Sequence, residues 1–282
     1  MTLREAVAKG RACLEGAGSE SPNLDAMLLL SFTLGISKER LYSAMSDALP
    51  PERESGYYAL IDRRASGTPV SYLMREKEFF GRSFYVDERV LAPRPDTETL
   101  IEAALALADS DPGVRRVHDL CTGSGCIALT IAAERPRLTV SASDVSPGAG
   151  EVFAVNARRI GFDPPFTLCS LFDGLDGPFD LVVSNPPYLT DEEVAQMRLR
   201  GLAEPEIALR GGIDGTDFYR TIAGEAKRVL GPRGCLLLEA APHQIDWLAG
   251  YLREQGYGAI ATYQDLAGRP RAVLVRHGAD VA

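Results

Sequence analysis

The stretch RRVHDLCTGSGCIA, residues 115–128, decides the fold class of this 282-residue chain. Residues 115–120 have the composition of a strand, and a turn with two glycines follows the strand directly. Gly123 and Gly125 allow this turn to be tight and allow the backbone to approach a ligand closely, because glycine has no side chain. A strand followed by such a turn and an apolar helix is typical of an α/β protein.

The chain after residue 114 repeats this order of strand and helix. The strand-like runs are residues 115–120, 138–144, 166–172, 179–184, 234–240, 259–264 and 271–277, and the clearest helices between them are 217–231 and 243–256. Such alternation predicts a doubly wound, mostly parallel sheet of seven strands. The last two runs are joined only by DLAGRP, residues 265–270, which is too short for a helical crossover. This pair is therefore expected to be antiparallel.

The first quarter of the chain shows no strand pattern. Apolar spacing near 3.6 residues and helix-ending glycines or helix-opening prolines predict helices over 3–18, 22–35 and 51–67. We therefore expect a helical domain over 1–75, a linker over 76–92 and an α/β domain over 93–282. In the linker, KEFFGRSFYV (77–86) predicts a β-hairpin that turns at Gly81-Arg82. The next helix is expected within 90–109, with Asp96 or Thr97 as its cap.

Composition and charge narrow the classes of function. The formal net charge is −9, and residues 1–75 hold nine basic and nine acidic side chains, so the rest of the chain carries the whole charge. The basic stripe of a nucleic-acid-binding protein is absent. No apolar run approaches the roughly 20 residues of a membrane helix, and the start lacks the pattern of a signal peptide. A cytoplasmic protein is expected. The five cysteines and three histidines are scattered, so neither a disulfide framework nor a metal site is predicted.

Two features at strand ends indicate a nucleoside-containing cofactor. The pattern Gly123-x-Gly125-x-x-Ala128 fits a dinucleotide-binding turn, and equally fits a plain turn between strand and helix. Asp144 closes the next strand, and an acid about 20 residues after the glycines can bind the two ribose hydroxyls of a nucleoside. Asp144 could also cap the helix that begins near Pro147, although Ser146 is better placed for that role. These features suit NAD and S-adenosylmethionine alike.

A third strand end separates the two cofactors. FDLVVSNPPYLT, residues 179–190, leaves a buried strand through Asn185, Pro186, Pro187 and Tyr188. The side-chain oxygen of Asn185 and the carbonyl of Pro186 can each accept a hydrogen bond from a planar NH2 group. The two prolines stiffen the turn so that both acceptors stay aimed, and Tyr188 can lie against the flat face of an amide or base. A methyltransferase acting on such an NH2 group needs this arrangement, whereas an NAD enzyme does not. The competing interpretation is a proline-rich strand exit.

With these motifs in place, the chain resembles the HemK/PrmC family of protein-(glutamine) methyltransferases, which modify peptide chain release factors. The resemblance covers essentially the whole chain and rests on FFGRSFYVDERVLAPRPDTETLIE (79–102), DLCTGSGCIAL (119–129), NPPY (185–188), EPEIALRGGIDGTDFYR (204–220) and DLAGRPRAVLV (265–275). It implies a class I S-adenosylmethionine-dependent methyltransferase fold with a small N-terminal helical domain that helps to grip the release factor. It also implies that the substrate is the glutamine of the Gly-Gly-Gln motif and that the product cofactor is S-adenosylhomocysteine.

The resemblance also implies roles for individual residues. The cofactor would be held at its methionine end by Cys121, Thr122, Gly123, Ser124 and Gly125, at its ribose by Asp144, near its adenine by Ser170 and Leu171, and beside Asn185. The glutamine amide would be held by Asn185, Pro186, Pro187 and Tyr188, in a pocket walled by Arg94 and Pro95; Asn185, Pro186 and Tyr188 are the expected catalytic residues. Four features depart from the family pattern. Cys121 replaces a usual glycine and Ser170 replaces a common acid. Ala240-Ala241 follow Glu239 where an Ile-Gly or similar pair is common, and SDVSPGAGEVFAVN (143–156) lacks the usual leucine after Ser-x-x-Ala.

Three other functions remain as alternatives. A glutamine methyltransferase of the same branch could act on a ribosomal protein. A nucleic-acid adenine or guanine N-methyltransferase shares the NPPY motif, but the acidic charge and the lack of a target-recognition insert count against it. An NAD-binding module would leave NPPY unexplained. We expect release factors as the protein partner, no stable nucleic-acid or membrane partner, and a monomer.

Overall fold

The computed structural model describes residues 1–199, 201 and 203–278, and the chain divides into two compact units. The first unit comprises Met1–Glu76 and Ala195–Ala203, and the second comprises Lys77–Val194 and Glu204–Ala282. This division differs from the expected one in two respects. The hairpin groups with the second unit instead of standing alone as a linker, and a short segment from the middle of the chain groups with the helical unit.

The first unit is helical, as its sequence predicts. Its helices are α1 (Leu3–Gly16), α2 (Pro22–Leu34), α3 (Lys38–Ser43), α4 (Pro51–Ala65) and α5 (Val70–Met74). Helices α1 and α4 are amphipathic, whereas α2 is apolar on most of its circumference, and all three pack in a common core that includes Leu14, Leu30 and Tyr57. Helix α1 begins with a capping box, in which the Thr2 side chain accepts a hydrogen bond from the Glu5 amide.

The second unit is an α/β domain. Its elements are β1 (Lys77–Phe79), β2 (Arg82–Phe84), α6 (Glu98–Ser110), β3 (Arg116–Leu120), α7 (Cys126–Glu134), β4 (Thr139–Asp144), α8 (Pro147–Ile160), β5 (Phe166–Leu168), β6 (Phe179–Ser184), α9 (Asp191–Leu199, which crosses the division between the units), α10 (Asp217–Val229), β7 (Leu230–Glu239), α11 (Ile245–Glu254), β8 (Tyr257–Gln264) and β9 (Pro270–His277), with short 3-10 turns η1 (Pro95–Thr97), η2 (Glu206–Ala208) and η3 (Pro242–Gln244).

Within the described residues the main sheet has seven strands in the order β5-β4-β3-β6-β7-β9-β8. The strands from β5 to β7 pair in parallel, while β9 is antiparallel to both β7 and β8. The predicted seven-stranded, mostly parallel sheet and its antiparallel pair are confirmed. The strand order reverses direction between β3 and β6, and ligands in such sheets bind beyond the carboxyl ends of the strands at that point.

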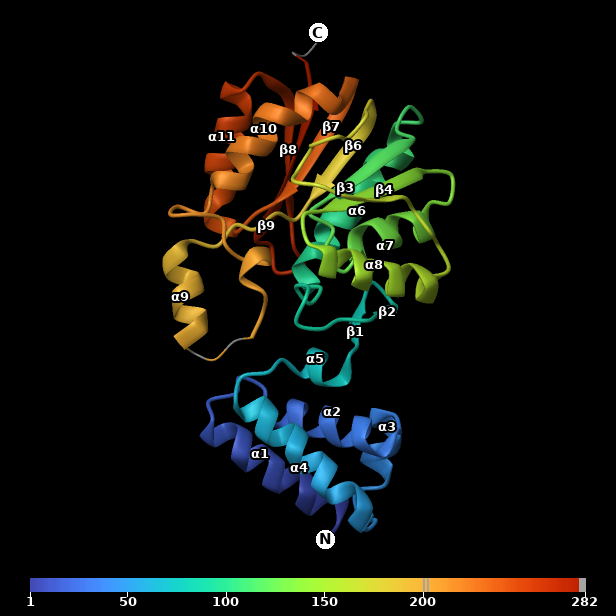
Figure 1. Ribbon diagram of the computed structural model, residues 1–282, viewed down its shortest axis with the longest axis vertical. Coiled ribbons are helices and arrows are strands. Elements are labelled where there is room, and N and C mark those ends of the chain that lie inside the picture. The colour runs from blue at the N-terminus through green and yellow to red at the C-terminus, as the bar shows by residue number, and fades with distance from the viewer. Residues whose placement is uncertain (200, 202, 279–282) are drawn as a thin grey trace. The chain divides into compact units, whose positions relative to one another are not determined.

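Helices cover both faces of this sheet (Figure 1). The period-2 alternation of the central strands divides their side chains between two cores. Leu181 and Val183 of β6 pack with α6, α7 and α8, whereas Val182 packs with α10 and α11. Strands buried on both faces read as continuous apolar runs, which is why they were recognisable in the sequence.

Two local predictions were wrong in detail, and a third was confirmed only in its position. The hairpin turns at Phe80-Gly81, which have φ of 48° and 69°, and Arg82 already pairs with Phe79 in the ladder. The run 166–172 is a strand only over Phe166–Leu168. Thr97 is the N-cap residue of α6, as predicted, but its side chain makes no capping hydrogen bond. Asp96 instead pairs with Arg271, and Thr97 accepts a hydrogen bond from Asn185.

Candidate active site at the carboxyl ends of the sheet

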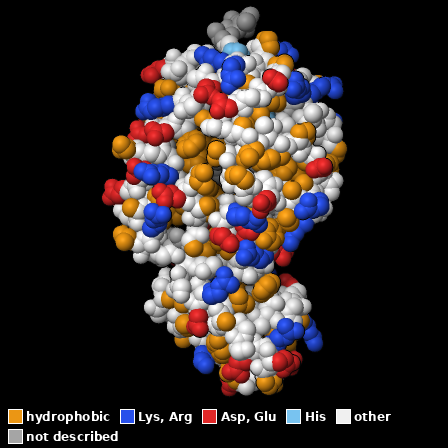
Figure 2. All heavy atoms as spheres, viewed as in Figure 1, with side chains coloured by type: hydrophobic (Ala, Val, Ile, Leu, Met, Phe, Trp, Pro, Cys, Tyr) orange, Lys and Arg blue, Asp and Glu red, His pale blue; other side chains and the backbone are white. Residues whose placement is uncertain are grey.

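A cavity of about 310 Å³ lies in the second unit beyond the carboxyl ends of β3, β4 and β6. Its volume is within the usual range for a small-molecule site. The residues expected at the site that line it are Arg94, Cys121, Thr122, Gly123, Ser124, Asp144, Ser170, Leu171, Asn185 and Pro187. The structure therefore brings together the glycine turn, the acid of the next strand and the asparagine turn. In the view of Figure 2, apolar side chains gather near the middle of this unit, with charged side chains around them.

The glycine turn combines unusual backbone with a buried anchor. Cys121, Gly123 and Gly125 all have positive φ, of 61°, 54° and 81°, and this conformation is strained for a cysteine. A Cβ atom built on Gly125 would lie 2.6 Å from a ring carbon of Phe153, whereas no described atom lies within 4 Å of a Cβ built on Gly123. Gly125 thus serves packing, and Gly123 leaves open space beside the cavity.

Asp119 holds this turn from below. It is completely buried, and one carboxyl oxygen accepts hydrogen bonds from the Ala128 amide at 3.0 Å and the Thr122 hydroxyl at 2.5 Å. Burial raises the pKa of Asp119 to about 7, although these two hydrogen bonds oppose the rise. The turn between β3 and α7 is therefore tied to the strand that precedes it.

Asp144 lies at the end of β4 with both carboxyl oxygens engaged. One accepts from the Gly123 amide and the other from the Ser146 amide, each at 2.9 Å. The Ser146 hydroxyl caps α8 through the Ala149 amide, as predicted. Asp144 is nevertheless less free to bind a ligand than we expected, because both of its carboxyl oxygens already accept backbone hydrogen bonds. Each carboxylate oxygen can accept more than one hydrogen bond, so capacity remains for a ribose hydroxyl. Burial raises the pKa of Asp144 despite the hydrogen bonds it accepts.

The asparagine turn borders the cavity only in part. Asn185 and Pro187 line it, and the Asn185 side-chain nitrogen donates to the Thr97 hydroxyl oxygen over 3.3 Å. Pro186 and Tyr188 do not line the cavity, nor do Pro95 and Gly125. The Tyr188 ring packs against the core on the α10 and α11 side of the sheet, and burial raises the pKa of its phenol.

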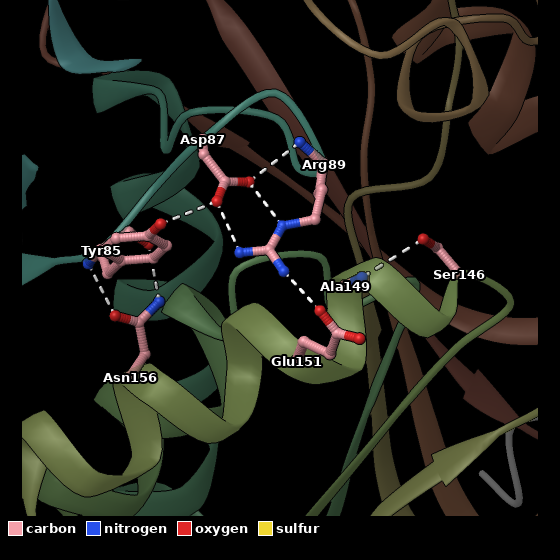
Figure 3. Close-up of polar contacts among 7 residues, drawn as sticks. All are labelled: Tyr85, Asp87, Arg89, Ser146, Ala149, Glu151 and Asn156. Carbon is pink, nitrogen blue, oxygen red and sulfur yellow. Dashed lines mark hydrogen bonds and ion pairs between the residues drawn. The ribbon is translucent and has the colours of Figure 1, made fainter. Parts of the chain in front are cut away.

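The sequence predicted only part of one wall of the cavity, at Arg94. Residues 89–93 line it beside Arg94, and the segment carrying them is fastened to α8 (Figure 3). Asn156 accepts from the Tyr85 amide at 2.6 Å and donates to the carbonyls of Tyr85 and Ser124 at 2.9 Å each. This buried side chain joins the wall to the glycine turn. A single asparagine within a helical segment carries no sequence signal for such a role.

An ion pair also connects this wall, residues 89–93, to α8 (Figure 3). The guanidinium of Arg89 contacts the buried Asp87 and the exposed Glu151, both at 2.5 Å. Burial alone would raise the pKa of Asp87, but hydrogen bonds from Arg89 and Tyr85 hold it at about 2. Asp87 therefore stays ionised at neutral pH and keeps Arg89 at the rim of the cavity.

The far rim comes from the segment after α9. Arg94 pairs at 2.5 Å with Glu204, whose side chain is buried, and Ile207 and Ala208 line the cavity nearby. In the sequence, these rim residues belong to the motif EPEIALRGG, which was noted only as part of the family resemblance. Within the described ranges, no group of three or more His, Cys, Asp or Glu side chains is arranged to hold a metal ion, and none of the helices has the length and apolar character needed to span a membrane.

The chain is similar to known methyltransferases over nearly its full length. Residues 5–74 match the PrmC N-terminal domain and residues 97–205 match the methyltransferase small domain. It is 38% identical to a release factor glutamine methyltransferase of Deinococcus radiodurans, covering 98% of this chain and 99% of that protein. It is 40% identical to one of Cereibacter sphaeroides, covering 97% and 96%. A methyltransferase structure from Pyrococcus furiosus shares the fold, with a TM-score of 0.52, 18% identity, and coverage of 72% of this chain and 92% of that one.

Proposed function

The chain belongs to the release factor glutamine methyltransferase family, and we propose that it methylates the side-chain amide nitrogen of the glutamine in the Gly-Gly-Gln motif of peptide chain release factors. The observation that carries this proposal is the single cavity lined by Gly123, Asp144 and Asn185. A nucleoside-binding turn and an amide-binding turn that open into one space can bring a methyl donor against a planar NH2 group.

The residues present fit S-adenosylmethionine. Its methionine end would lie along the turn from Cys121 to Gly125, where the open side of Gly123 admits close approach. Asp144 retains acceptor capacity for the ribose, and Ser170 and Leu171 line the cavity where the adenine is expected. The Ser170 hydroxyl would replace the usual acid as the polar group beside that base.

Asn185 and Pro186 would orient the amide for reaction. An amide nitrogen is a weak nucleophile, because its lone pair is delocalised into the carbonyl. When bound, S-adenosylmethionine supplies an electrophilic methyl group on a positively charged sulfur. Acceptors at the Asn185 side-chain oxygen and the Pro186 carbonyl would hold the two N–H groups so that the lone pair points at that methyl, and they favour the positive charge that grows on nitrogen.

The proposed methyl transfer needs no general base from the protein. The amide nitrogen would form the new N–C bond as the C–S bond to the methyl group breaks, and the electron pair of that bond would stay with S-adenosylhomocysteine, the leaving group. After transfer the nitrogen would release one proton to solvent water. Asn185 is neutral, so we assign it no role in accepting that proton. Its contribution is preorganisation, which needs no rearrangement during the reaction.

We also propose that the helical domain, residues 1–75, helps to hold the release factor. It matches the PrmC N-terminal domain over residues 5–74. The catalytic residues Asn185, Pro186 and Tyr188 remain part of this proposal, as do the substrate-contacting Arg94, Pro95 and Pro187. A substrate that works on the ribosome would place the protein in the cytoplasm, where we propose that it acts as a monomer.

The test compares methyl transfer to three candidate substrates. The purified protein is incubated with S-adenosylmethionine labelled in its methyl group and, separately, with a release factor, ribosomes and DNA. A release factor whose Gly-Gly-Gln glutamine is changed to asparagine serves as the matched control. The proposal is supported if label enters only the release factor that retains its Gly-Gly-Gln glutamine. Label in ribosomal protein or DNA, or equal label in the control, would overturn it.

A further inference from the structure

A buried carboxyl group lies behind the asparagine turn and outside the cavity. Glu239 ends β7 and is 2% exposed, and its Oε2 atom has no hydrogen-bond partner among the described residues. Hydrogen bonds from the Thr97 and Tyr188 side chains lower the pKa of this carboxyl group, and the charged side chains that act on it are Asp96, which raises its pKa, and Arg271, which lowers it. An acid kept in such a place is costly unless neighbouring donors compensate it.

Thr97 connects this acid to the asparagine. Its side chain is buried, it lines the cavity, and its oxygen accepts the hydrogen bond from the Asn185 side-chain nitrogen. A hydroxyl has one proton to donate. Since an ionised carboxylate can only accept, Thr97 would donate its proton to Glu239 and leave its oxygen to receive the N–H of Asn185.

This direction decides which end of the Asn185 amide faces the substrate. With the nitrogen held by Thr97, the oxygen remains as the acceptor for the substrate NH2 group. If the Asn185 amide were flipped, its NH2 group would face the substrate NH2 group, and two donors would meet without an acceptor. We propose that Glu239 is a positioning residue that acts through Thr97 to hold Asn185 with its oxygen toward the substrate amide, and through Tyr188 to anchor the other end of the NPPY turn. The inference rests on the proposed function.

The ionisation of Glu239 makes this arrangement pH-dependent. Its pKa is about 7, because burial and, to a lesser extent, Asp96 raise it more than Thr97, Arg271 and Tyr188 lower it. Cys126 and Tyr219 are also within electrostatic range of Glu239, and burial raises the pKa of both. The acceptor form of Glu239 therefore becomes dominant as pH rises through about 7, and the methyl-transfer rate should rise over the same interval.

The test compares Thr97→Val with Thr97→Ser in single-turnover methyl transfer at saturating S-adenosylmethionine. Valine removes the hydroxyl at nearly constant volume, so the rate should fall at least about tenfold, while serine keeps the hydroxyl and should stay within about threefold of wild type. Thr130→Val is the matched control, because Thr130 is fully buried, has a hydroxyl without a partner among the described residues, and does not line the cavity. Equal rates in Thr97→Val and Thr130→Val would overturn the proposal.

A second readout does not depend on the substrate. The side-chain amide resonance of Asn185, assigned by its absence in Asn185→Ala, should shift with pH in the wild type with a midpoint near 7 and stay constant in Glu239→Gln. Because burial also raises the pKa of Asp119 to about 7, a shift that persists in Glu239→Gln would assign the titration to another group and refute the role of Glu239. If the wild type transfers no methyl group to the release factor, the proposed function fails, while this resonance still decides the positioning role.

Discussion

The two glycines of the turn after β3 should respond differently to the same substitution. Gly123→Ala and Gly125→Ala both place a Cβ on backbone of positive φ, which costs roughly 1–2 kcal/mol in each case. At Gly125 the added carbon would lie 2.6 Å from Phe153 Cδ2 and 3.0 Å from Leu129 Cδ1, both in the core. Overpacking of this kind adds about 1–3 kcal/mol. At Gly123 no described atom lies within 4 Å, so only the backbone cost applies.

Gly125→Ala should therefore lose about 1–3 kcal/mol more stability than Gly123→Ala, which corresponds to several degrees in the midpoint of thermal unfolding. For cofactor binding we expect the opposite order, with Gly123→Ala more damaging than Gly125→Ala. Gly123 lines the cavity and Gly125 does not, so the carbon added at Gly123 enters the space proposed for S-adenosylmethionine. Calorimetric titration of both variants with the cofactor, beside their thermal unfolding, measures the two effects separately.

The reasoning fails if the two variants unfold at the same temperature, because the close contact with Phe153 would then have no energetic consequence. It also fails if Gly123→Ala binds S-adenosylmethionine as tightly as the wild type. The turn would then not approach the ligand, and its interpretation as a plain turn between strand and helix would stand.

Three further predictions concern single side chains. Asn185→Ala should slow single-turnover transfer on the order of 100-fold while the protein still folds, with Asn185→Asp retaining more activity because it keeps an acceptor; a near-normal rate in Asn185→Ala would reduce NPPY to a strand exit. Asp144→Ala should weaken S-adenosylmethionine binding by about 1–3 kcal/mol, and NAD should not compete in the same calorimetric titration; comparable NAD affinity would contradict the cofactor assignment. The pKa of Glu239 is about 7 in the folded protein against 4.5 as its ordinary value, so the folded state binds this proton more tightly and the free energy of unfolding should fall by roughly 3 kcal/mol as pH rises across that interval. Glu239→Gln should remove this part of the slope in urea unfolding, and an unchanged slope would mean that Glu239 does not titrate there.

The strands were predictable because each one is defined by its own residues. A strand buried on both faces must be apolar along its length, and its exit must be polar or contain glycine or proline. Phe179–Ser184 followed by Asn185 shows both properties within a few residues. The meeting of three strand exits in one cavity then follows from a general rule of parallel sheets, which is why most of the candidate site could be inferred without coordinates.

The cap of α6 shows where this reasoning ends. Asp96 and Thr97 have side chains typical of a helix cap, and local sequence favours that role. In the folded chain Asp96 pairs with Arg271 and Thr97 contacts Asn185, which is 88 residues away. A long-range partner replaced the local one, and no pattern within the helix reports such competition.

The sequence by itself determined the class of fold, the chemical types of the groups at the strand exits and the spacing that marks a nucleoside site beside an amide site. Only the tertiary structure decided which side chains support them: Asn156 beneath the wall of residues 89–93, Asp119 beneath the glycine turn, and Thr97 and Glu239 behind Asn185. The physical reason is that propensity and hydrophobic period are properties of neighbouring residues. The partner of a buried polar group is set by strand order, register and packing, which bring together residues far apart in the chain.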